Sequence, residues 1–453
     1  MSTTESSYDR RLLERHNQYG PGRPSSGRGD FGRDRDRILY SSAFRTLDGK
    51  TQVVASYELG NAHNRLTHSL KVGQLGESIA RRLNSVARGP DPYLVHAACL
   101  AHDIGHPPFG HAGEDALASA LDKARRAELG LVKGEEAADA LDGFEGNAQN
   151  LRVLTYLAVH SDVTRRGLHL TRATLAAATK YPWARGQSGK TARKWGAYKS
   201  EIETLDWITE YRPAGLVRSI EADLMDWCDD VTYAVHDMED FYRLGLIPLH
   251  NLFNFDLAAD HPSAGRDATD DLLEFLAFAA TKWDESEYGA FDQEGVVQLL
   301  HVLADNISVS EPFRPTRRHK GLLRQTVTDL ISYFADCVDF DGRGCGYDGA
   351  LVVPKERRLL CDVLKLLIWK YVIARPEFAR QQVGQERIIE SLVTWLLEQP
   401  ERLLPEDRRE ELDQHGDAIR AVADHIASLT ESSARHLYRK LSGQDLGAFT
   451  DAI

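Results

Sequence analysis

Apolar residues recur at helical spacing along nearly the whole chain from residue 34 onward, and this periodicity restricts the fold more than any other feature of the sequence. One such stripe in residues 70–83 consists of Val72, Leu75, Ile79 and Leu83. A stripe of this kind is typical of an amphipathic helix that buries one face. Strand-like alternation is confined to short stretches. The sequence therefore predicts an all-α fold.

The same periodicity gives the expected positions of the helices. They fall at residues 70–83, 91–104, 112–122, 144–158, 171–180, 215–243, 268–282, 293–306, 318–338, 354–374, 384–399 and 405–440. Residues 49–54 and 342–353 are suited to short hairpins. The charged residues 33–37 are expected to form an exposed helix start.

Composition divides the chain into three expected regions. Residues 1–33 are rich in Arg, Gly, Ser and Pro, a composition that buries little core, so they are predicted to form a mobile arm. A polar stretch with Pro and Gly near residues 256–267 separates a catalytic domain, residues 34–255, from a helical C-terminal lobe, residues 256–453. We expect the lobe to serve assembly and closure of the substrate pocket.

Bulk properties exclude several classes of protein. No apolar run approaches the roughly 20 residues that a membrane span needs, and the N-terminus has no secretory core, so a cytoplasmic protein without membrane contact is expected. The five cysteines show no C-x-x-C spacing and suit small buried positions. The formal net charge of −13 opposes polyanions, so any nucleotide site requires a local basic patch.

Imidazole and carboxylate groups are concentrated between residues 102 and 114. This stretch contains His102, Asp103, His106, His111 and Glu114. An apolar helix pattern in residues 94–101 runs into it, which places the His-Asp pair at the buried end of a helix. Adjacent helix residues point about 100° apart, so the pair needs metal-binding partners from other helices.

Two residues elsewhere in the chain, His68 and Asp229, are candidates for these partners. Such a mixed nitrogen and oxygen set suits Mg²⁺ or Mn²⁺, with Fe²⁺, Co²⁺ or Zn²⁺ as the other candidates. Taken alone, His68 suits a hydrogen-bonded core histidine and His111 a surface histidine at a helix start. The occurrence of the other candidate residues, in this order along the chain, favours a functional role for both histidines.

Six strings carry a resemblance to a known family. They are residues 42–53, 65–70, 102–114, 144–150, 180–183 and 229–237. In this order they resemble the HD-domain metal phosphohydrolases, and within them the deoxyguanosine-triphosphate triphosphohydrolase group. The resemblance spans roughly residues 34–245. It implies that His68, His102, Asp103 and Asp229 bind the metal.

The resemblance also implies an acid–base pair beside the metal. His111 and Glu114 lie at positions i and i+3 near a helix start and share a face. A carboxylate against an imidazole fixes its tautomer and raises its basicity, and the matching pair in the family performs acid–base catalysis. His106 resembles an additional active-site position of the family.

Further residues match substrate contacts of the family. Asp229, Tyr233 and Asp237 recur at i, i+4 and i+8 and so are expected in one line along a helix. By resemblance, Tyr233 packs under the deoxyribose and Asp237 accepts from its 3′-hydroxyl. The other matching positions are Gln52 for the sugar, Arg65 and Lys180 for phosphate, and Asn147 and Tyr181 for the pocket.

Residues 183–199 are basic with interleaved aromatics. Such a run is suited to a platform for single-stranded DNA or to a loop on the substrate side of the pocket, and we favour the loop.

The sequence by itself supports a helical metal hydrolase with an anionic substrate. The resemblance implies a metal-dependent triphosphohydrolase that converts dGTP or other dNTPs to deoxynucleoside and triphosphate. One alternative is an HD phosphohydrolase for another nucleotide phosphoester. The other is a nucleotide-sensing or single-stranded-DNA-binding module with little turnover. The helical lobe and the family precedent also suggest a homo-oligomer, often a hexamer.

Overall fold

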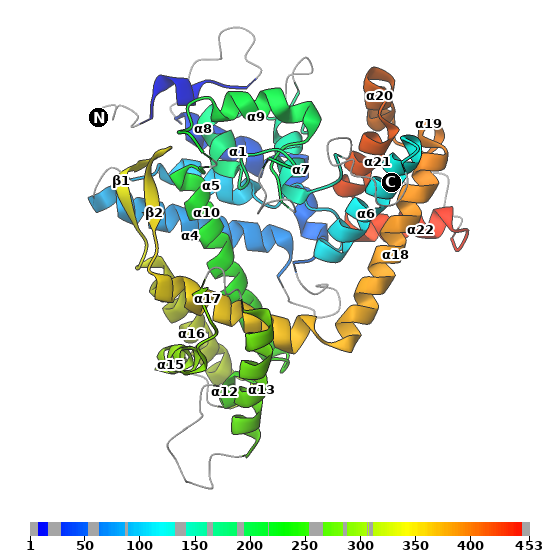
Figure 1. Cartoon of the computed structure of the whole chain (residues 1–453). Coiled ribbons are helices and arrows are strands. Elements are labelled where there is room, and N and C mark those ends of the chain that lie inside the picture. Colours follow the sequence, from blue (N-terminus) through cyan, green and yellow to red (C-terminus); the bar gives the residue numbers. More distant parts are fainter. Residues whose placement is uncertain are drawn as a thin grey trace.

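The structure is a computed structural model, and it describes residues 8–16, 29–52, 63–86, 89–131, 142–160, 166–187, 194–215, 217–252, 266–283, 288–305, 307 and 311–445. Within these residues helices form almost all of the regular structure (Figure 1). Strands β1 (Asp339–Cys345) and β2 (Asp348–Val352) pair antiparallel as one hairpin. The all-α prediction is confirmed, as is the hairpin within residues 342–353.

The first half of the chain supplies the helices that surround the His-Asp pair. They are η1 (Arg10–Leu13), α1 (Asp30–Leu39), α2 (Ser42–Thr46), η2 (Leu47–Gly49), α4 (Arg65–Val86), α5 (Pro92–Ala101), α6 (Gly110–Glu128), α7 (Gly146–Arg152), η3 (Val153–Leu157), α8 (Arg172–Ala178), η4 (Lys199–Glu201), α9 (Ile202–Thr209), α10 (Ile220–Thr232), η5 (Tyr233–Asp237), α11 (Met238–Arg243) and α12 (Leu249–Leu252).

The second half continues with further helices on either side of the hairpin. They are α13 (Arg266–Lys282), α15 (Gln293–Asp305), α16 (Arg317–Ala335), α17 (Lys355–Ile368), η6 (Trp369–Ile373), α18 (Pro376–Glu398), α19 (Pro400–Leu403), α20 (Glu406–His415), α21 (Ala418–Ser428) and α22 (Glu431–Leu441). None of the helices in the described ranges is both long enough and apolar enough to cross a membrane.

Capping side chains explain where several of these helices begin. Asp91 accepts hydrogen bonds from the backbone N–H groups of Tyr93 and Leu94 at the start of α5. Ser219 caps α10 in the same way. The predicted helix over residues 215–243 therefore begins later, at Ile220, and a π-helical turn, η5, interrupts it.

The start of the chain's first long helix differs from the expectation for residues 33–37. Helix α1 begins earlier, at Asp30, and Asp34 is fully buried instead of exposed. Its carboxylate accepts hydrogen bonds from Arg15 at 2.5 Å and from the backbone N–H of Thr171 at 2.8 Å. Hydrogen bonds from residues elsewhere in the sequence thus stabilise the buried carboxylate of Asp34.

Three apolar clusters hold the helices together. The largest joins α4, α5 and α10 to α13, α15, α16 and α17. A second lies between α1, α2, the end of α5, α8 and α9. In the third, α6 packs against α18, α21 and α22. Helix α18 runs from the first group to the third (Figure 1).

The structure describes only parts of the predicted arm, hairpin and domain boundary. Most of the N-terminal arm, residues 53–54 of one predicted hairpin and the boundary segment 253–265 lie outside the described residues. The largest core cluster contains both Leu249 and Leu272, so apolar packing continues across residue 255. The stretch predicted as helical over residues 405–440 forms three helices. Gly416 adopts a left-handed conformation (φ +69°) after α20, and Thr430 caps the start of α22.

Candidate active site

The His-Asp pair lies in a tight turn that directly follows α5. The helix ends at Ala101, and His102 is its C-terminal cap. The predicted helix continued to residue 104, shortly before Pro107 and Pro108, which a helix cannot include without being broken. In the structure the prolines follow a helix that has already ended, and they belong to the next turn.

Asn150 of α7 holds the turn from both ends. Its Nδ2 donates a hydrogen bond to the carbonyl of His102, and its Oδ1 accepts one from the backbone N–H of Gly105 at 2.5 Å. A Cβ atom at residue 105 would lie 2.3 Å from the backbone nitrogen of Asn150, so this close approach requires glycine.

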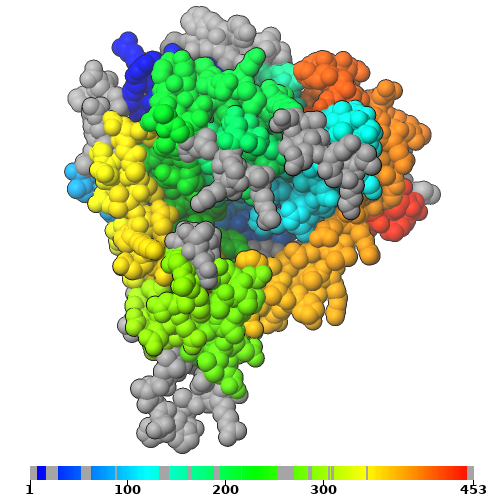
Figure 2. Space-filling model, viewed as in Figure 1, coloured from blue at the N-terminus to red at the C-terminus, as the bar shows by residue number. Residues whose placement is uncertain are grey.

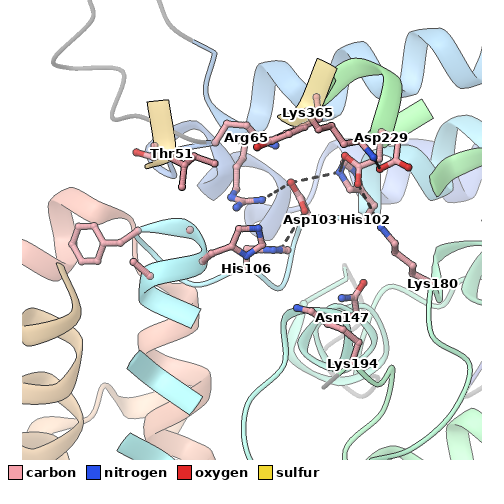
Figure 3. A pocket seen from close by; sticks show the side chains of 18 of the residues that line it. Thr51, Arg65, His102, Asp103, His106, Asn147, Lys180, Lys194, Asp229 and Lys365 are labelled. Atoms are coloured by element: carbon pink, nitrogen blue, oxygen red, sulfur yellow. Dashed lines mark hydrogen bonds and ion pairs between the residues drawn. The ribbon is translucent and has the colours of Figure 1, made fainter. Parts of the chain in front are cut away.

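The structure brings the four predicted metal ligands together from α4, from the turn after α5 and from α10. The Nε2 atom of His68, on α4, lies 3.0 Å from Oδ1 of Asp229, on α10. The Nε2 atom of His102 lies 3.5 Å from carboxylate oxygens of both Asp103 and Asp229. Donor atoms of His68, His102 and Asp103 all lie within 4.8 Å of one another. Figure 3 shows His102, Asp103 and Asp229 directed toward a common point.

This donor set fits a divalent metal ion. The Nδ1–H group of His102 donates to the carbonyl of Cys99 at 2.7 Å, which makes Nε2 the ring nitrogen that can bind a metal. That Nε2 atom is buried and makes no hydrogen bond within the described part of the chain. Two imidazoles and two carboxylates form a mixed set that accepts Mg²⁺, Mn²⁺, Fe²⁺, Co²⁺ or Zn²⁺.

Arg65 balances the negative charge of this group. Its guanidinium lies 2.6 Å from Oδ2 of Asp103, and both side chains are buried. Burial opposes ionisation of Asp103, but Arg65 and the neighbouring imidazoles outweigh it and hold the pKa of Asp103 well below its usual range. Burial also lowers the pKa of His102, but the two carboxylates raise it to about 9.

A second group, His106, His111 and Glu114, lies beside the first. His106 Nδ1 is 3.2 Å from Oδ1 of Asp103, which joins the two groups. His111 Nδ1 lies 3.4 Å from Oε2 of Glu114, and His106 Nε2 lies 4.0 Å from the same oxygen. The donor atoms of the three side chains are close enough that this group could also hold a metal.

The protonation states of this second group differ. Burial, followed by the charge of Arg65, lowers the pKa of His106 to about 3, so its ring is neutral near pH 7. Burial raises the pKa of Glu114, but His111 and His106 outweigh burial and keep the carboxyl ionised. The side chain of His111 is 77% exposed and faces solvent, so it can exchange protons with water.

A cavity of about 390 Å³ opens beside both groups. Figure 2 shows a recess bordered by the green and orange segments. The cavity lining comes from these segments and from residues 51–112. Its charged and aromatic lining residues are Arg65, His102, Asp103, His106, Phe109, His111, Lys180, Tyr181, Lys194, Asp229, Asp230, Tyr233, Lys365 and Phe378. Figure 3 shows Arg65, Lys180, Lys194 and Lys365 arranged around the His-Asp pair.

Six of the seven predicted substrate contacts line the cavity. They are Gln52, Arg65, Asn147, Lys180, Tyr181 and Tyr233. Lys180 Nζ lies 3.7 Å from Asp229 and 2.5 Å from Asp226, so its positive charge is next to the metal ligands.

Asp237 differs from the expectation of a single line of side chains along α10. Among the described residues that line the cavity, Tyr233 is present and Asp237 is absent. The π-helical turn over residues 233–237 changes the angular step, so positions i+4 and i+8 do not stay in line. Asp237 is buried, its Oδ2 has no hydrogen-bond partner in the described ranges, and burial raises its pKa well above the usual value.

The basic run at residues 183–199 contributes one side chain to the site. Lys194 Nζ lies 3.0 Å from Glu145 and 3.4 Å from Glu114. Trp183, Trp195 and Tyr198 are buried in a small cluster, so these rings present no stacking face. Residues 188–193 lie outside the described residues. The described part therefore favours a substrate-side loop over a DNA platform.

Several site residues carried no signal in the sequence. Lys365, Ile373, Phe378, Gln382 and Gln385 reach the cavity from α17, η6 and α18. They sit in ordinary amphipathic patterns far beyond Asp229 in the sequence. The packing of α17 against α10 and of α18 against α6 brings that region to the site. Lys194 had a partial signal, because it belongs to the basic run.

Comparison with known proteins agrees with the geometry. Residues 65–172 match the HD domain family, and residues 351–440 match the phosphohydrolase-associated domain family. The deoxyguanosinetriphosphate triphosphohydrolase-like protein of Streptomyces coelicolor is 37% identical, covering 92% of this chain and 93% of its own length. The proteins of the same name from Corynebacterium efficiens and Bifidobacterium longum are 36% and 32% identical over 92% and 91% of this chain, and the matches cover 92% and 83% of their own lengths.

The helical fold and its His-Asp centre define a metal-dependent phosphohydrolase of the HD class. Within that class, the extent of the similarity shows that the chain belongs to the deoxyguanosinetriphosphate triphosphohydrolase-like family.

Proposed function

We propose that the protein hydrolyses dGTP or other dNTPs to deoxynucleoside and inorganic triphosphate. One observation carries the proposal: the His-Asp centre faces a cavity lined by four cationic side chains in a chain of net charge −13. These are Arg65, Lys180, Lys194 and Lys365. A local concentration of positive charge against the global field suits a polyanionic substrate. The names of the relatives support a nucleoside triphosphate.

The metal centre would consist of His68, His102, Asp103 and Asp229. A divalent ion held there, with Mg²⁺ or Mn²⁺ favoured, polarises a phosphoryl oxygen and lowers the pKa of a bound water. Arg65 keeps Asp103 ionised and ready as a ligand.

The proposed reaction joins a water oxygen to the α-phosphorus and breaks the bond from that phosphorus to the 5′-oxygen. The leaving 5′-oxygen must gain a proton, and the attacking water must lose one. His111, ionised Glu114 and neutral His106 lie beside the His-Asp centre and are the groups we assign to these transfers. Lys180, Lys194 and Lys365 would hold the phosphates in line.

Tyr233 and Asp237 are the proposed sugar contacts. Tyr233 lines the cavity one helical turn beyond Asp229, where a ring against C2′ would exclude a 2′-hydroxyl. The unpaired buried oxygen of Asp237 would accept from a 3′-hydroxyl only if a small rearrangement opened it to the cavity. Gln52, Asn147 and Tyr181 would contact the remainder of the nucleotide.

The test is product identification. Purified protein is incubated with dGTP, dATP, dCTP or dTTP and with Mg²⁺ or Mn²⁺, and the products are separated by ion-exchange chromatography. Equal amounts of deoxynucleoside and intact triphosphate are expected, with no product after chelation or in Asp103→Ala. Orthophosphate or pyrophosphate as the first product would point to another phosphohydrolase. Salt-dependent binding of single-stranded DNA without loss of dNTP would favour the binding module.

We further propose a homo-oligomer, with a hexamer as the leading form.

A further inference from the structure

Lys50 is a buried lysine bound to two distant parts of the backbone. Its side chain is 2% exposed. The Nζ atom donates to the carbonyl of His106 at 2.6 Å and to the carbonyl of Ala427, in α21, at 2.8 Å. Two acceptors need only two N–H donors, so the contact persists whether the amine is charged or neutral. One side chain thus ties the turn after the His-Asp pair to a helix near the C-terminus.

Glu431, at the start of α22, makes a matching contact from the other side. Its Oε1 accepts hydrogen bonds from the backbone N–H of Thr51 at 2.9 Å and of Phe109 at 3.2 Å. The side chain is buried. The preceding residue, Thr430, packs so closely on Gly49 that a Cβ there would lie 2.6 Å from its methyl carbon.

The turn between these contacts has few local interactions to maintain it. Phe109 and Gly110 both have positive φ, +71° and +58°. Phe109 is also the N-terminal cap residue of α6, and its side chain makes no capping hydrogen bond to the first turn of that helix. A bulky residue in this conformation costs free energy, so the surrounding structure must hold it. Lys50 and Glu431 are the side chains that do so at His106 and Phe109.

We propose that Lys50 and Glu431 are positioning residues that set the His106–Gly110 turn, and through it His106, His111 and Glu114, against the metal centre. The proposal rests on the proposed function for its kinetic consequence. It also gives the C-terminal helices α21 and α22 a direct role in shaping the site. The metal ligands lie outside the turn, so the two residues act on the reaction step more than on metal binding.

The test removes each contact at constant side-chain length and then restores it. Lys50→Met and Glu431→Met delete the donor and the acceptor. Lys50→Arg keeps N–H donors, and a cavity of about 120 Å³ beside Lys50 can take the larger group. Glu431→Gln keeps the accepting oxygen. Arg125→Met is the control, because Arg125 joins α6 to Asp417 at the start of α21 at 2.7 Å but contacts neither the turn nor the cavity.

Steady-state kinetics with dGTP and Mn²⁺, corrected for the folded fraction, give the first readout. We expect kcat to fall by about 10- to 100-fold in both methionine variants, because small displacements of reacting groups have effects of this size. The KM for dGTP and the Mn²⁺ affinity should change by less than about threefold. Arg and Gln at these positions should restore most of the rate. A wild-type kcat in the methionine variants, or an equal loss in Arg125→Met, would overturn the proposal.

Hydrogen exchange separates this proposal from the proposed function. If the wild-type protein fails to hydrolyse any dNTP, the substrate assignment falls, but the turn can still be measured. Amides of residues 106–112 should exchange faster in Lys50→Met and Glu431→Met than in the wild type and in Arg125→Met. Unchanged exchange in the methionine variants would show that the two residues do not hold the turn.

Discussion

His102 shows how one backbone contact prepares a side chain for metal binding. Because Nδ1–H donates to the carbonyl of Cys99, Nε2 is the ring nitrogen that faces Asp103 and Asp229. The contact lies within one helical turn, so it follows from α5 itself. Arg65 then supplies the positive charge that the buried carboxylate of Asp103 needs.

His111 offers a test of the proton-transfer assignment. In His111→Ala we expect turnover to fall by about 10²- to 10⁴-fold, the usual contribution of a general acid or base. Metal and dGTP binding should persist, because the side chain is 77% exposed and contacts Glu114, not the His-Asp centre. Single-turnover rates and Mn²⁺ titration measure the two effects. His301→Ala, at an exposed position of α15, is the control, and a parallel loss of metal binding in His111→Ala would contradict the assignment.

At the scale of elements, the site depends on turns between helices. The turn over residues 102–105 is fixed by Asn150 of α7, and the turn over residues 106–110 by contacts from η2 and α22. The π-helical turn η5 sets how the residues after Asp229 face the cavity. The contacts that hold the first two turns join segments that lie far apart in the sequence.

Gly105→Ala tests the first of these turns. The added Cβ would lie 2.3 Å from the backbone nitrogen of Asn150 and 2.5 Å from the carbonyl oxygen of Gly146. Backbone atoms cannot rotate away, so the turn must shift, at a cost of about 1–3 kcal/mol in unfolding free energy. We expect Mn²⁺ affinity to fall as well. Urea unfolding and Mn²⁺ titration check both effects. Gly32→Ala in α1, where a Cβ meets nothing within 4 Å, should leave Mn²⁺ affinity unchanged.

At the scale of the whole molecule, residues from both halves of the chain line the cavity. Thr51, Gln52 and the turn at residues 106–112 form one side, while α17, η6 and α18 complete it. The packing of α6 against α18, α21 and α22 holds these parts together. We infer that separating the C-terminal helices from the chain would open the site.

Buried Lys50 gives this packing a pH dependence. Burial, with a smaller effect from Arg65, lowers its pKa from the usual 10.5 to about 7. Between these values the unfolded chain binds a proton that the folded protein does not, so the contribution of Lys50 to stability rises as pH increases from 7 to 10.5. The unfolding free energy of the wild type relative to Lys50→Met should grow by up to about 5 kcal/mol across this range.

Urea unfolding of both proteins at several pH values between 7 and 10 measures this difference. Titration of other groups is common to the two proteins and cancels. Parallel stability curves would show that Lys50 keeps an ordinary pKa in the folded state.

The sequence by itself determined the helical class, the family and the ligand types. Helical periodicity and ordered motifs are local, so His68, His102, Asp103 and Asp229 could be proposed as a set before any coordinates were known. The sequence also placed Arg65 and Lys180 among the candidate phosphate contacts, through its resemblance to the family. These inferences needed only the order of short strings.

Only the tertiary structure decided where those groups meet and what else joins them. Lys365 and Glu431 reach the site from distant helices, and their neighbours in the sequence give no sign of it. The burial of Asp34 and the shift of Asp237 away from the line of Asp229 and Tyr233, which the π-helical turn causes, likewise depend on packing. The physical reason is that a periodic pattern specifies which face of a helix is buried, whereas the partner of that face is set by long-range packing that local spacing does not encode.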